Sequence, residues 1–452
     1  MSSSSHILPS RRHTRQKAAH CNIVNVIIVA AAAVAVVGFT LFLVGSEHRG
    51  DAHARDALLL HQQDAVKEGT QQPQQQLALL HGLETQETKV KNDLLPLVDA
   101  YHALTTKTSK VSAKKQRLAY AITITKDGLF QDGAAVLAYS IMEQHRGKKY
   151  DVSLVAFVHP NVTTSRPALE KIGFHVIESP TPINSSAIKF KWFREHIDKN
   201  GCCGSSELIK LNSYRLLQYD KVIHMDADTF LLNPIDDVLG TGHSVVYTTD
   251  PNMASHKGED KMPYQGGFLV FQPNYTDYTR IVNLLMTVEF RSGSAWNGSK
   301  IGWFWGGMTV QGILPFYYNL NTDPGRSVRV DRCYYNTMAD TADCLVQSLE
   351  EIRSAHFTVC LKPWHCLKPG GFSNSLCEKL HQRWFETRRR AEHFYGLADE
   401  PQPCPRGGHK HYKFMRLQDA RVPPGVFRPD DSPRILLPVG NSGYRPDAFP
   451  AE

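Results

Sequence analysis

Residues 221–238 read KVIHMDADTFLLNPIDDV, in which a run of strand length leads directly into Asp226 and Asp228. Residues two apart at the end of a strand can turn toward one point, so their carboxylates can hold one hard cation. Mg²⁺ in such sites commonly keeps positions for phosphate oxygens, and it neutralises charge that develops on a departing diphosphate. An isolated Asp-X-Asp triplet is usually a solvated turn, but the apolar continuation at residues 230–232 favours a metal site.

A phosphatase of the haloacid-dehalogenase type also places an Asp-X-Asp triplet after a strand. That class of enzyme requires a threonine four positions after the first aspartate, and this chain has Phe230 there. Its motif normally follows the first strand of the domain, whereas residues 221–225 form about the fourth. The phosphatase is therefore the weaker alternative.

The chain before Asp226 alternates between strand and helix patterns. Apolar, β-branched runs predict strands at residues 117–125, 151–158, 174–178 and 221–225. Helical patterns cover residues 132–145, 165–173 and 205–220, the last with Leu208, Leu211, Tyr214 and Leu217 on one face. This alternation indicates a parallel α/β sheet with right-handed crossovers. Ligands of such sheets bind at the carboxyl ends of the strands, where Asp226 lies.

The chain beyond residue 240 has a looser pattern. We expect strands at residues 243–249 and 266–273 and helices at residues 278–290 and 378–396. Pro, Gly and Arg dominate from residue 401 onward, so residues 401–452 are expected to form an irregular or disordered tail.

An uncharged apolar run at residues 23–44 predicts one membrane anchor, because about twenty such residues cross a bilayer as a helix. Positive charge precedes the run, and positive flanks stay cytosolic. The expected organisation is a cytosolic tail (1–20), a transmembrane signal anchor (21–46), a stem (47–115), a catalytic domain (116–400) and the tail (401–452). This predicts a single-pass type II protein with a luminal catalytic domain, in the Golgi or another membrane of the secretory pathway. A cleaved signal peptide remains the alternative.

Composition agrees with a luminal protein and argues against nucleic-acid binding. The net charge is +7, and four of the positive residues lie before residue 20, so little basic surplus remains for nucleic acid.

Eight of the nine cysteines follow residue 46, an even number suited to disulfides. Plausible bridges join Cys333 with Cys344 and pair Cys360, Cys366, Cys377 and Cys404 among themselves, whereas adjacent Cys202 and Cys203 fit no pattern cleanly. Four Asn-X-Ser/Thr sequons also follow the anchor, at Asn161, Asn184, Asn274 and Asn297.

A second polar signal lies at residues 355–366, AHFTVCLKPWHC. His356 can contribute an imidazole to a metal site, and nitrogen ligands suit Mn²⁺ better than Mg²⁺. Lys362 can place a point charge on a phosphate. Either residue alone is more often a core or surface side chain; only the pair, taken with Asp226 and Asp228, justifies a metal-diphosphate site.

Five segments in this order resemble a family 8 glycosyltransferase, of the retaining type that includes glycogenin. They read AYAITITKDGLFQDGAAVLAYSI, IKLNSYRLLQYDKVIHMDADTFLLNPIDDV, YQGGFLVFQPN, VQGILPFYY and HFTVCLKPW, and they span roughly residues 117–364. The resemblance implies a GT-A fold: a Rossmann-like mixed α/β sheet with flanking helices, here preceded by the anchor and the stem.

The resemblance also implies roles for particular residues. Manganese would be held by Asp226, Asp228 and His356, with Mg²⁺ as the alternative ion. The UDP-sugar donor would be bound by Thr123, Asp226, Asp228, Gln265, Gly266, Gly267 and Lys362. Catalysis would involve Gln311 near the anomeric carbon, Lys210 near the donor sugar and phosphates, and Asp250 on the sugar.

One departure from the family pattern concerns the segment WGGMTVQG, where Trp305 and Met308 stand in place of two acids beside Gly306 and Gly307. The sequence therefore leaves the donor sugar open. The expected activity is transfer of a hexose-type sugar from a UDP-sugar to an unknown glycan, protein or lipid acceptor, with retention at the anomeric carbon. A catalytically silent nucleotide-sugar-binding scaffold is the main alternative.

Overall fold

The computed structural model describes residues 115–423, except 129, 148, 254–257 and 398–401. The predicted anchor, the stem and the end of the tail lie outside the described residues. Within the described part, no helix combines the length and apolar character needed to cross a bilayer.

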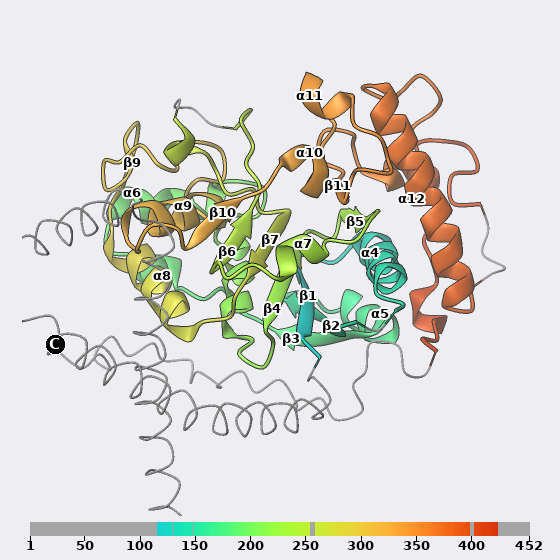
Figure 1. Cartoon of the computed structure of the whole chain (residues 1–452), viewed down its shortest axis with the longest axis horizontal. Coiled ribbons are helices and arrows are strands. Elements are labelled where there is room, and N and C mark those ends of the chain that lie inside the picture. Colours follow the sequence, from blue (N-terminus) through green and yellow to red (C-terminus); the bar gives the residue numbers. More distant parts are fainter. Residues whose placement is uncertain (1–114, 129, 148, 254–257, 398–401, 424–452) are drawn as a thin grey trace, which may run out of the picture. The chain divides into compact units, whose positions relative to one another are not determined.

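A mixed seven-stranded sheet forms the centre of the fold (Figure 1). Its order is β10-β6-β7-β4-β1-β2-β3, and β7 runs antiparallel to both of its neighbours while the other pairs are parallel. The strands are β1 (Arg117–Ile124), β2 (Asp151–Val158), β3 (Phe174–Glu178), β4 (Lys221–Met225), β6 (Val245–Tyr247), β7 (Phe268–Phe271) and β10 (Ser327–Arg329). Two small antiparallel sheets pair β5 (Thr229–Leu231) with β11 (Ser354–His356), and β8 (Phe290–Arg291) with β9 (Ala295–Trp296).

Helices cover both faces of this sheet, because successive strand side chains point to opposite sides. Tyr120 and Ile122 of β1 join one apolar core, whereas Ala119 and Ala121 join the other. The first core is covered by α4 (Phe130–Gln144), α5 (Ser165–Lys171) and α12 (Ser375–Phe394), and α12 lies beside α4 in Figure 1. The second is covered by α6 (Lys191–His196), η3 (Gly204–Arg215), α8 (Tyr275–Thr287) and α9 (Val310–Leu320). The arrangement fits the GT-A-like mixed sheet with flanking helices.

Short elements connect these layers. They are η1 (Ser185–Ala187), η2 (Ile197–Lys199), α7 (Asp236–Leu239), η4 (Glu259–Lys261), α10 (Arg332–Tyr335), α11 (Ala342–Leu345), η5 (Pro363–His365), η6 (His409–His411) and η7 (Leu417–Asp419).

The predicted helix at residues 205–220 is a 3₁₀ helix, η3, that ends earlier. Leu208, Leu211 and Tyr214 are all buried, as predicted, because side chains three apart align in a helix with three residues per turn. Leu217, placed on the same face by the sequence pattern, follows the end of η3 and is 55% exposed, so that prediction is wrong.

Six cysteines form three disulfides, Cys333–Cys344, Cys360–Cys377 and Cys366–Cys404. The bridges predicted from the sequence are confirmed, and the connectivity left open among the last four is now defined. Cys202 and Cys203 carry free thiols.

The expected domain end at residue 400 falls inside the packed structure. Residues 402–423 contain only short 3₁₀ turns, but Tyr412, Met415 and Leu417 are buried in the same core as α4 and α12. Cys404 ties this segment to Cys366. The described part of the predicted tail is therefore irregular in conformation but packed against the sheet layer.

Candidate active site

Two elements bring the three predicted metal ligands together. β4 ends at Met225, so Asp226 and Asp228 follow at its carboxyl end. β5 then pairs with β11, and the register sets His356 opposite Thr229. The amide of Phe357 donates to the Asp228 carbonyl at 3.0 Å and extends this pairing. Strand pairing thus places a residue from late in the sequence beside the Asp-X-Asp turn.

The candidate ligand atoms of Asp226, Asp228 and His356 all lie within 4.8 Å of one another. His356 Nε2 is 3.8 Å from Asp226 Oδ2 and 3.4 Å from Asp228 Oδ1. Two carboxylates and one imidazole form a donor set that suits Mn²⁺, and its oxygens also suit Mg²⁺. The residues present therefore fit a divalent cation.

His356 is buried against a glycine. Its Nδ1 has no hydrogen-bond partner among the described residues. A Cβ at Gly267 would lie 2.4 Å from that nitrogen, so only glycine fits there. The imidazole is fixed between Gly267 and the two carboxylates, with Nε2 also 2.9 Å from Thr358 Oγ1.

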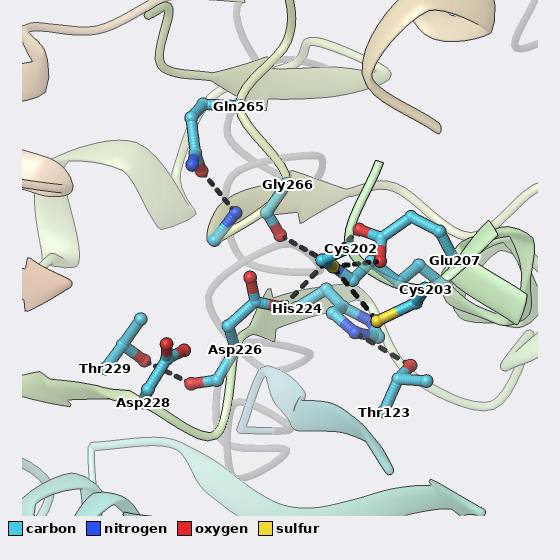
Figure 2. A network of polar contacts seen from close by, with 12 residues as sticks. Thr123, Cys202, Cys203, Glu207, His224, Asp226, Asp228, Thr229, Gln265 and Gly266 are labelled. Carbon is cyan, nitrogen blue, oxygen red and sulfur yellow. Dashed lines mark hydrogen bonds and ion pairs between the residues drawn. The ribbon is translucent and has the colours of Figure 1, made fainter. Parts of the chain in front are cut away.

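Two lysines pair with the carboxylates of Asp226 and Asp228. Figure 2 shows these carboxylates together with Glu207 and Gly266. Lys210 Nζ lies 2.7 Å from Asp226 Oδ1 and 2.5 Å from Glu207 Oε1. It also donates a hydrogen bond to the Gly266 carbonyl oxygen at 3.1 Å. Lys362 pairs with Asp228 and also donates to the Phe357 carbonyl at 2.7 Å. Each metal-ligand candidate carboxylate thus has one ammonium partner.

Burial and charge act in opposite directions in this cluster. Burial alone would raise the pKa of Asp228, but His356 and Lys362 outweigh it and hold that pKa below its ordinary value. Burial alone would lower the pKa of Lys210, yet Asp226 and Glu207 raise it above the ordinary value. Both groups therefore stay charged at neutral pH.

The Gln265–Gly267 segment forms one wall of the site. Gln265 Oε1 accepts from the Gly267 amide at 2.5 Å and from Asn336 Nδ2 at 2.9 Å. The Gly266 amide donates to Gln311 Oε1 at 3.4 Å. A Cβ at Gly266 would lie 2.9 Å from Lys210 Nζ, so this glycine allows the lysine to approach the backbone. The same Cβ would lie 3.7 Å from Gln311 Cγ, so Gln311 and Lys210 are both held next to Gly266.

Thr123 and Asp250 have other partners than the three ligand candidates. Thr123 Oγ1 lies 3.1 Å from His224 Nε2, whose Nδ1 is 2.9 Å from Ser213 Oγ. Burial and the Lys210 charge lower the pKa of His224 well below its ordinary value. The imidazole in the Thr123–His224–Ser213 hydrogen-bond network is therefore neutral. Asp250 accepts from the Asn252 amide at 3.0 Å, and burial raises its pKa although Arg332 opposes this.

The segment WGGMTVQG differs from the family pattern at Trp305 and Met308, and these two side chains lie in different environments. Trp305 is 63% exposed, whereas Met308 is buried in an apolar core and its amide donates to Asn200 Oδ1 at 3.0 Å. A Cβ at Gly306 would lie 2.7 Å from Gln311 Nε2. The segment therefore supplies close backbone packing for Gln311 and no carboxylate.

Glu207 and Asn336 are not among the site residues predicted from the sequence, and no role is predicted there for the cysteine pair. Glu207 lies three residues before Lys210, which is the spacing of neighbours on a helix, so its pairing with Lys210 could have been found. Asn336 gives no sequence signal, because it reaches Gln265 only through the folding of the α10 segment. Cys202 and Cys203 were noted as a pair, but their position beside Glu207 depends on the turn before η3.

The fold and the site together define an α/β protein with a candidate divalent-cation site at the end of a central strand. Glycogenins are among its curated relatives. Human glycogenin-2 is 24% identical over 308 residues, which are 67% of this chain and 54% of that protein. Glycogenin-1 of Oryctolagus cuniculus is 28% identical over 207 residues, 44% of this chain and 56% of that protein. The chain thus spans about half the length of the curated relatives it matches, and no protein-family model matches it.

Solved glycosyltransferase structures also align with the chain. The bifunctional glycosyltransferase WbbM gives a TM-score of 0.39 at 14% identity, covering 61% of this chain and 50% of that one. The galactosyltransferase LgtC, with donor and acceptor sugar analogues, gives 0.36 at 11% identity, covering 60% and 95%. Mouse xyloside xylosyltransferase 1 gives 0.32 at 13% identity, covering 54% and 98%. The glycogenin relatives confirm the sequence-based recognition: the chain resembles the glycogenin-like family 8 glycosyltransferases.

Proposed function

We propose that this protein is a retaining, metal-dependent glycosyltransferase of the hexosyltransferase type. It transfers a hexose-type sugar from a UDP-sugar to an acceptor glycan, protein or lipid, and it works on the luminal side of a secretory-pathway membrane. The observation that carries the proposal is the convergence of Asp226, Asp228 and His356 beside two lysines. The glycogenin relatives favour sugar transfer over other metal-dependent chemistry.

Asp226, Asp228 and His356 would hold Mn²⁺, or Mg²⁺ in its place. When bound, the cation supplies Lewis-acid neutralisation of the charge on a leaving diphosphate. Asp226 has a side chain that is 28% exposed, so a cation entering with a nucleotide can reach it. His356 and Asp228 are nearly buried and provide the fixed part of the site.

The lysines and the glutamine act on the donor itself. Lys362 is 25% exposed, so it can leave Asp228 and contact a diphosphate oxygen as a point charge. Lys210 is held by three oxygens and positions Asp226 and the Gly266 carbonyl at the sugar side. Gln311 is a weak nucleophile, so it stabilises the developing oxocarbenium-like sugar electrostatically, and the acceptor attacks from the face that the diphosphate leaves.

The phosphatase alternative has no supporting residue at its key position. Phe230, where that mechanism requires a threonine, is buried in β5 and stacks on Phe357 at 5.7 Å. Replacement of the family's acids by Trp305 and Met308 is the one observation that favours a silent sugar-nucleotide-binding scaffold.

A screen of UDP-sugars against the full-length protein tests the proposal. Release of UDP would be followed for each donor with Mn²⁺ and after chelation of the metal. Metal-dependent release from one donor is the expected result, and it identifies the sugar. UDP binding without release from any donor would replace transfer with the scaffold function. Absence of both binding and release would refute the proposal.

A further inference from the structure

Cys202 and Cys203 lie side by side in the turn that leads from η2 into η3. They are the two thiols that remain free among the described cysteines. Their Sγ atoms are 3.0 Å apart. Cys202 is exposed and Cys203 is partly exposed, so a small reagent can reach the pair.

The pair is connected to the candidate cation site through two charged side chains (Figure 2). Cys202 Sγ lies 3.9 Å from Glu207 Oε2. The other oxygen of Glu207 contacts Lys210 at 2.5 Å, and Lys210 contacts Asp226 at 2.7 Å. Cys203 contacts Thr125, the residue after β1, with its Sγ 3.8 Å from the threonine Oγ1.

The same turn packs against the segment that positions Gln311. A Cβ at Gly201 would lie 3.1 Å from Gly306 Cα, so the two backbones are in direct contact. Asn200 Oδ1 accepts from the Met308 amide at 3.0 Å. A change in the shape of this turn therefore acts on Glu207 and on the segment beside Gln311.

We propose that Cys202 and Cys203 are a redox modification site that closes reversibly into a disulfide between adjacent residues. The reagent is a disulfide, either a small one such as oxidised glutathione or that of a dithiol oxidoreductase. Gly201 (φ +72°) and Gly204 (φ +57°) flank the pair with left-handed backbone, which provides the conformational freedom that such a small ring needs.

Adjacency makes this disulfide different from the other three. Consecutive Cα atoms are about 3.8 Å apart across a trans peptide, whereas disulfides ordinarily join Cα atoms about 4.4–6.8 Å apart. A disulfide at Cys202–Cys203 is therefore strained and easier to reduce than an unstrained structural bridge. It suits a reversible modification rather than a structural link.

The chemistry is two successive thiol–disulfide exchanges. The hydrogen bond from the Cys202 thiol lowers the pKa of Cys203, so Cys203 is the better first nucleophile. Its thiolate attacks one sulfur of the reagent, and the other sulfur leaves as a thiolate that takes up the released proton. Cys202 then loses its proton and attacks Cys203 Sγ, and the second reagent thiol leaves. Two protein thiols are oxidised, and the reagent disulfide is reduced to two thiols.

Closing the ring removes the Cys202 S–H beside Glu207 and reshapes the turn against Gly306. Both changes act on the Glu207–Lys210–Asp226 chain, so the two redox forms differ in their affinity for a divalent cation. This consequence rests on the proposed function, whereas the disulfide itself does not.

The first experiment measures the disulfide without any activity assay. The full-length protein is equilibrated in glutathione buffers of graded thiol-to-disulfide ratio, its free thiols are alkylated, and cysteine peptides are analysed by mass spectrometry. We expect the Cys202–Cys203 peptide to lose two hydrogens reversibly at ratios where Cys333–Cys344, Cys360–Cys377 and Cys366–Cys404 stay oxidised. Three results would each overturn the proposal. The thiols stay free in the most oxidising buffer, the new bridge resists reduction as strongly as the other three, or bound zinc protects the thiols from oxidation.

The second experiment measures Mn²⁺ affinity of the two forms after the buffer is removed. We expect the dissociation constants to differ by about fivefold or more, the lower range of coupling between distinct sites. The matched control is the Cys202→Ser/Cys203→Ser double variant. Its Mn²⁺ affinity should be the same whichever glutathione buffer it was equilibrated in. Equal affinities in the wild type would remove the link to the cation site. Failure of the UDP-sugar screen would leave the mass-spectrometric result standing, so the two failures are distinguishable.

Discussion

At the residue scale, the site is an alternating cluster of carboxylates and ammonium groups. Asp226 and Asp228 each contact one lysine, and His356 lies between their oxygens. A cation must therefore compete with Lys210 and Lys362 for these oxygens. Lys210 is nearly buried and also held by Glu207, whereas Lys362 is partly exposed. If a cation binds there as proposed, we expect it to displace Lys362 first and to free this lysine for the diphosphate of the donor.

Asp228→Asn should reduce metal-dependent UDP release by about 100-fold or more, because the neutral amide removes one charged metal ligand. The fold should persist, since asparagine matches the aspartate in size. Turnover and a thermal melt by circular dichroism would be measured on the same preparation. Glu178→Gln, an exposed carboxylate paired with Arg166, is the charge-matched control. Unchanged turnover in Asp228→Asn would remove Asp228 from the metal site.

Lys362→Met should tighten Mn²⁺ binding in the absence of nucleotide by up to about tenfold, because the competing ammonium is gone. The same variant should bind UDP more weakly, because the point charge for the diphosphate is lost. Both constants can be obtained by titration, with free Mn²⁺ followed by electron paramagnetic resonance. Weaker Mn²⁺ binding without nucleotide would contradict the competition described for this lysine.

At the scale of elements, the 3₁₀ form of η3 determines how Glu207 and Lys210 meet. Side chains three apart are eclipsed in a helix with three residues per turn, so the carboxylate stands beside the ammonium. Leu208, Leu211 and Tyr214 are eclipsed in the same way and pack on the sheet. η3 therefore anchors itself through one row and presents the ion pair through another.

Glu207→Gln should weaken Mn²⁺ binding by about fivefold to tenfold, because Lys210 then pairs with Asp226 alone and competes more strongly with the cation. The affinity would be measured by calorimetric titration of the metal. Glu195→Gln, which changes an exposed glutamate of α6 beside Lys191, provides the control for loss of a glutamate charge. If the affinity of Glu207→Gln equals that of the control, Glu207 does not position Lys210.

At the scale of the whole described structure, an ion network fastens residues 402–420 to α4 and α12. Asp132 is fully buried and accepts from Arg388 Nη2 at 3.2 Å, from Tyr412 Oη at 2.6 Å and from the Met415 amide at 3.2 Å. A buried carboxylate needs these partners, because an unpaired charge in the core is costly. The segment after α12 is therefore part of the same folded unit as α4 and α12.

A chain that ends at residue 400 should be less stable than one that ends at residue 423, by about 3 kcal/mol or more. The shorter chain lacks Cys404 and leaves Asp132 without Tyr412 and Met415. Urea unfolding of the two chains, followed by tryptophan fluorescence, would compare their free energies of unfolding. Equal midpoints and slopes would show that the segment only covers the core.

The proposed luminal location predicts N-linked glycans on the exposed sequons. All four asparagines, at positions 161, 184, 274 and 297, are exposed. Asn184 and Asn274 use their Oδ1 atoms to cap following helices, which leaves Nδ2 available for a glycan. In a host that glycosylates such triplets, an endoglycosidase should increase gel mobility, and a variant with all four changed to Gln should not respond. No shift in the wild type would argue against the luminal topology.

Several elements could be predicted because they depend on nearest neighbours in the chain. β2, β3 and β4 have the bounds that their apolar runs indicate, and Asp226 follows β4 directly. The spacing of Leu208, Leu211 and Tyr214 also contains the three-residue period of η3. Leu217 was misplaced because the end of η3 depends on the tight turn into β4.

The sequence by itself determined the α/β alternation, the Asp-X-Asp turn after β4, and the set of cysteines that form bridges, since each follows from local pattern or residue count. Only the tertiary structure decided that β7 runs antiparallel beside β4 and that β11 pairs with β5 to bring His356 to Asp228. It also decided that the Cys202–Cys203 pair lies beside Glu207. The physical reason is that packing of distant segments, rather than local propensity, sets which polar side chains share a buried space.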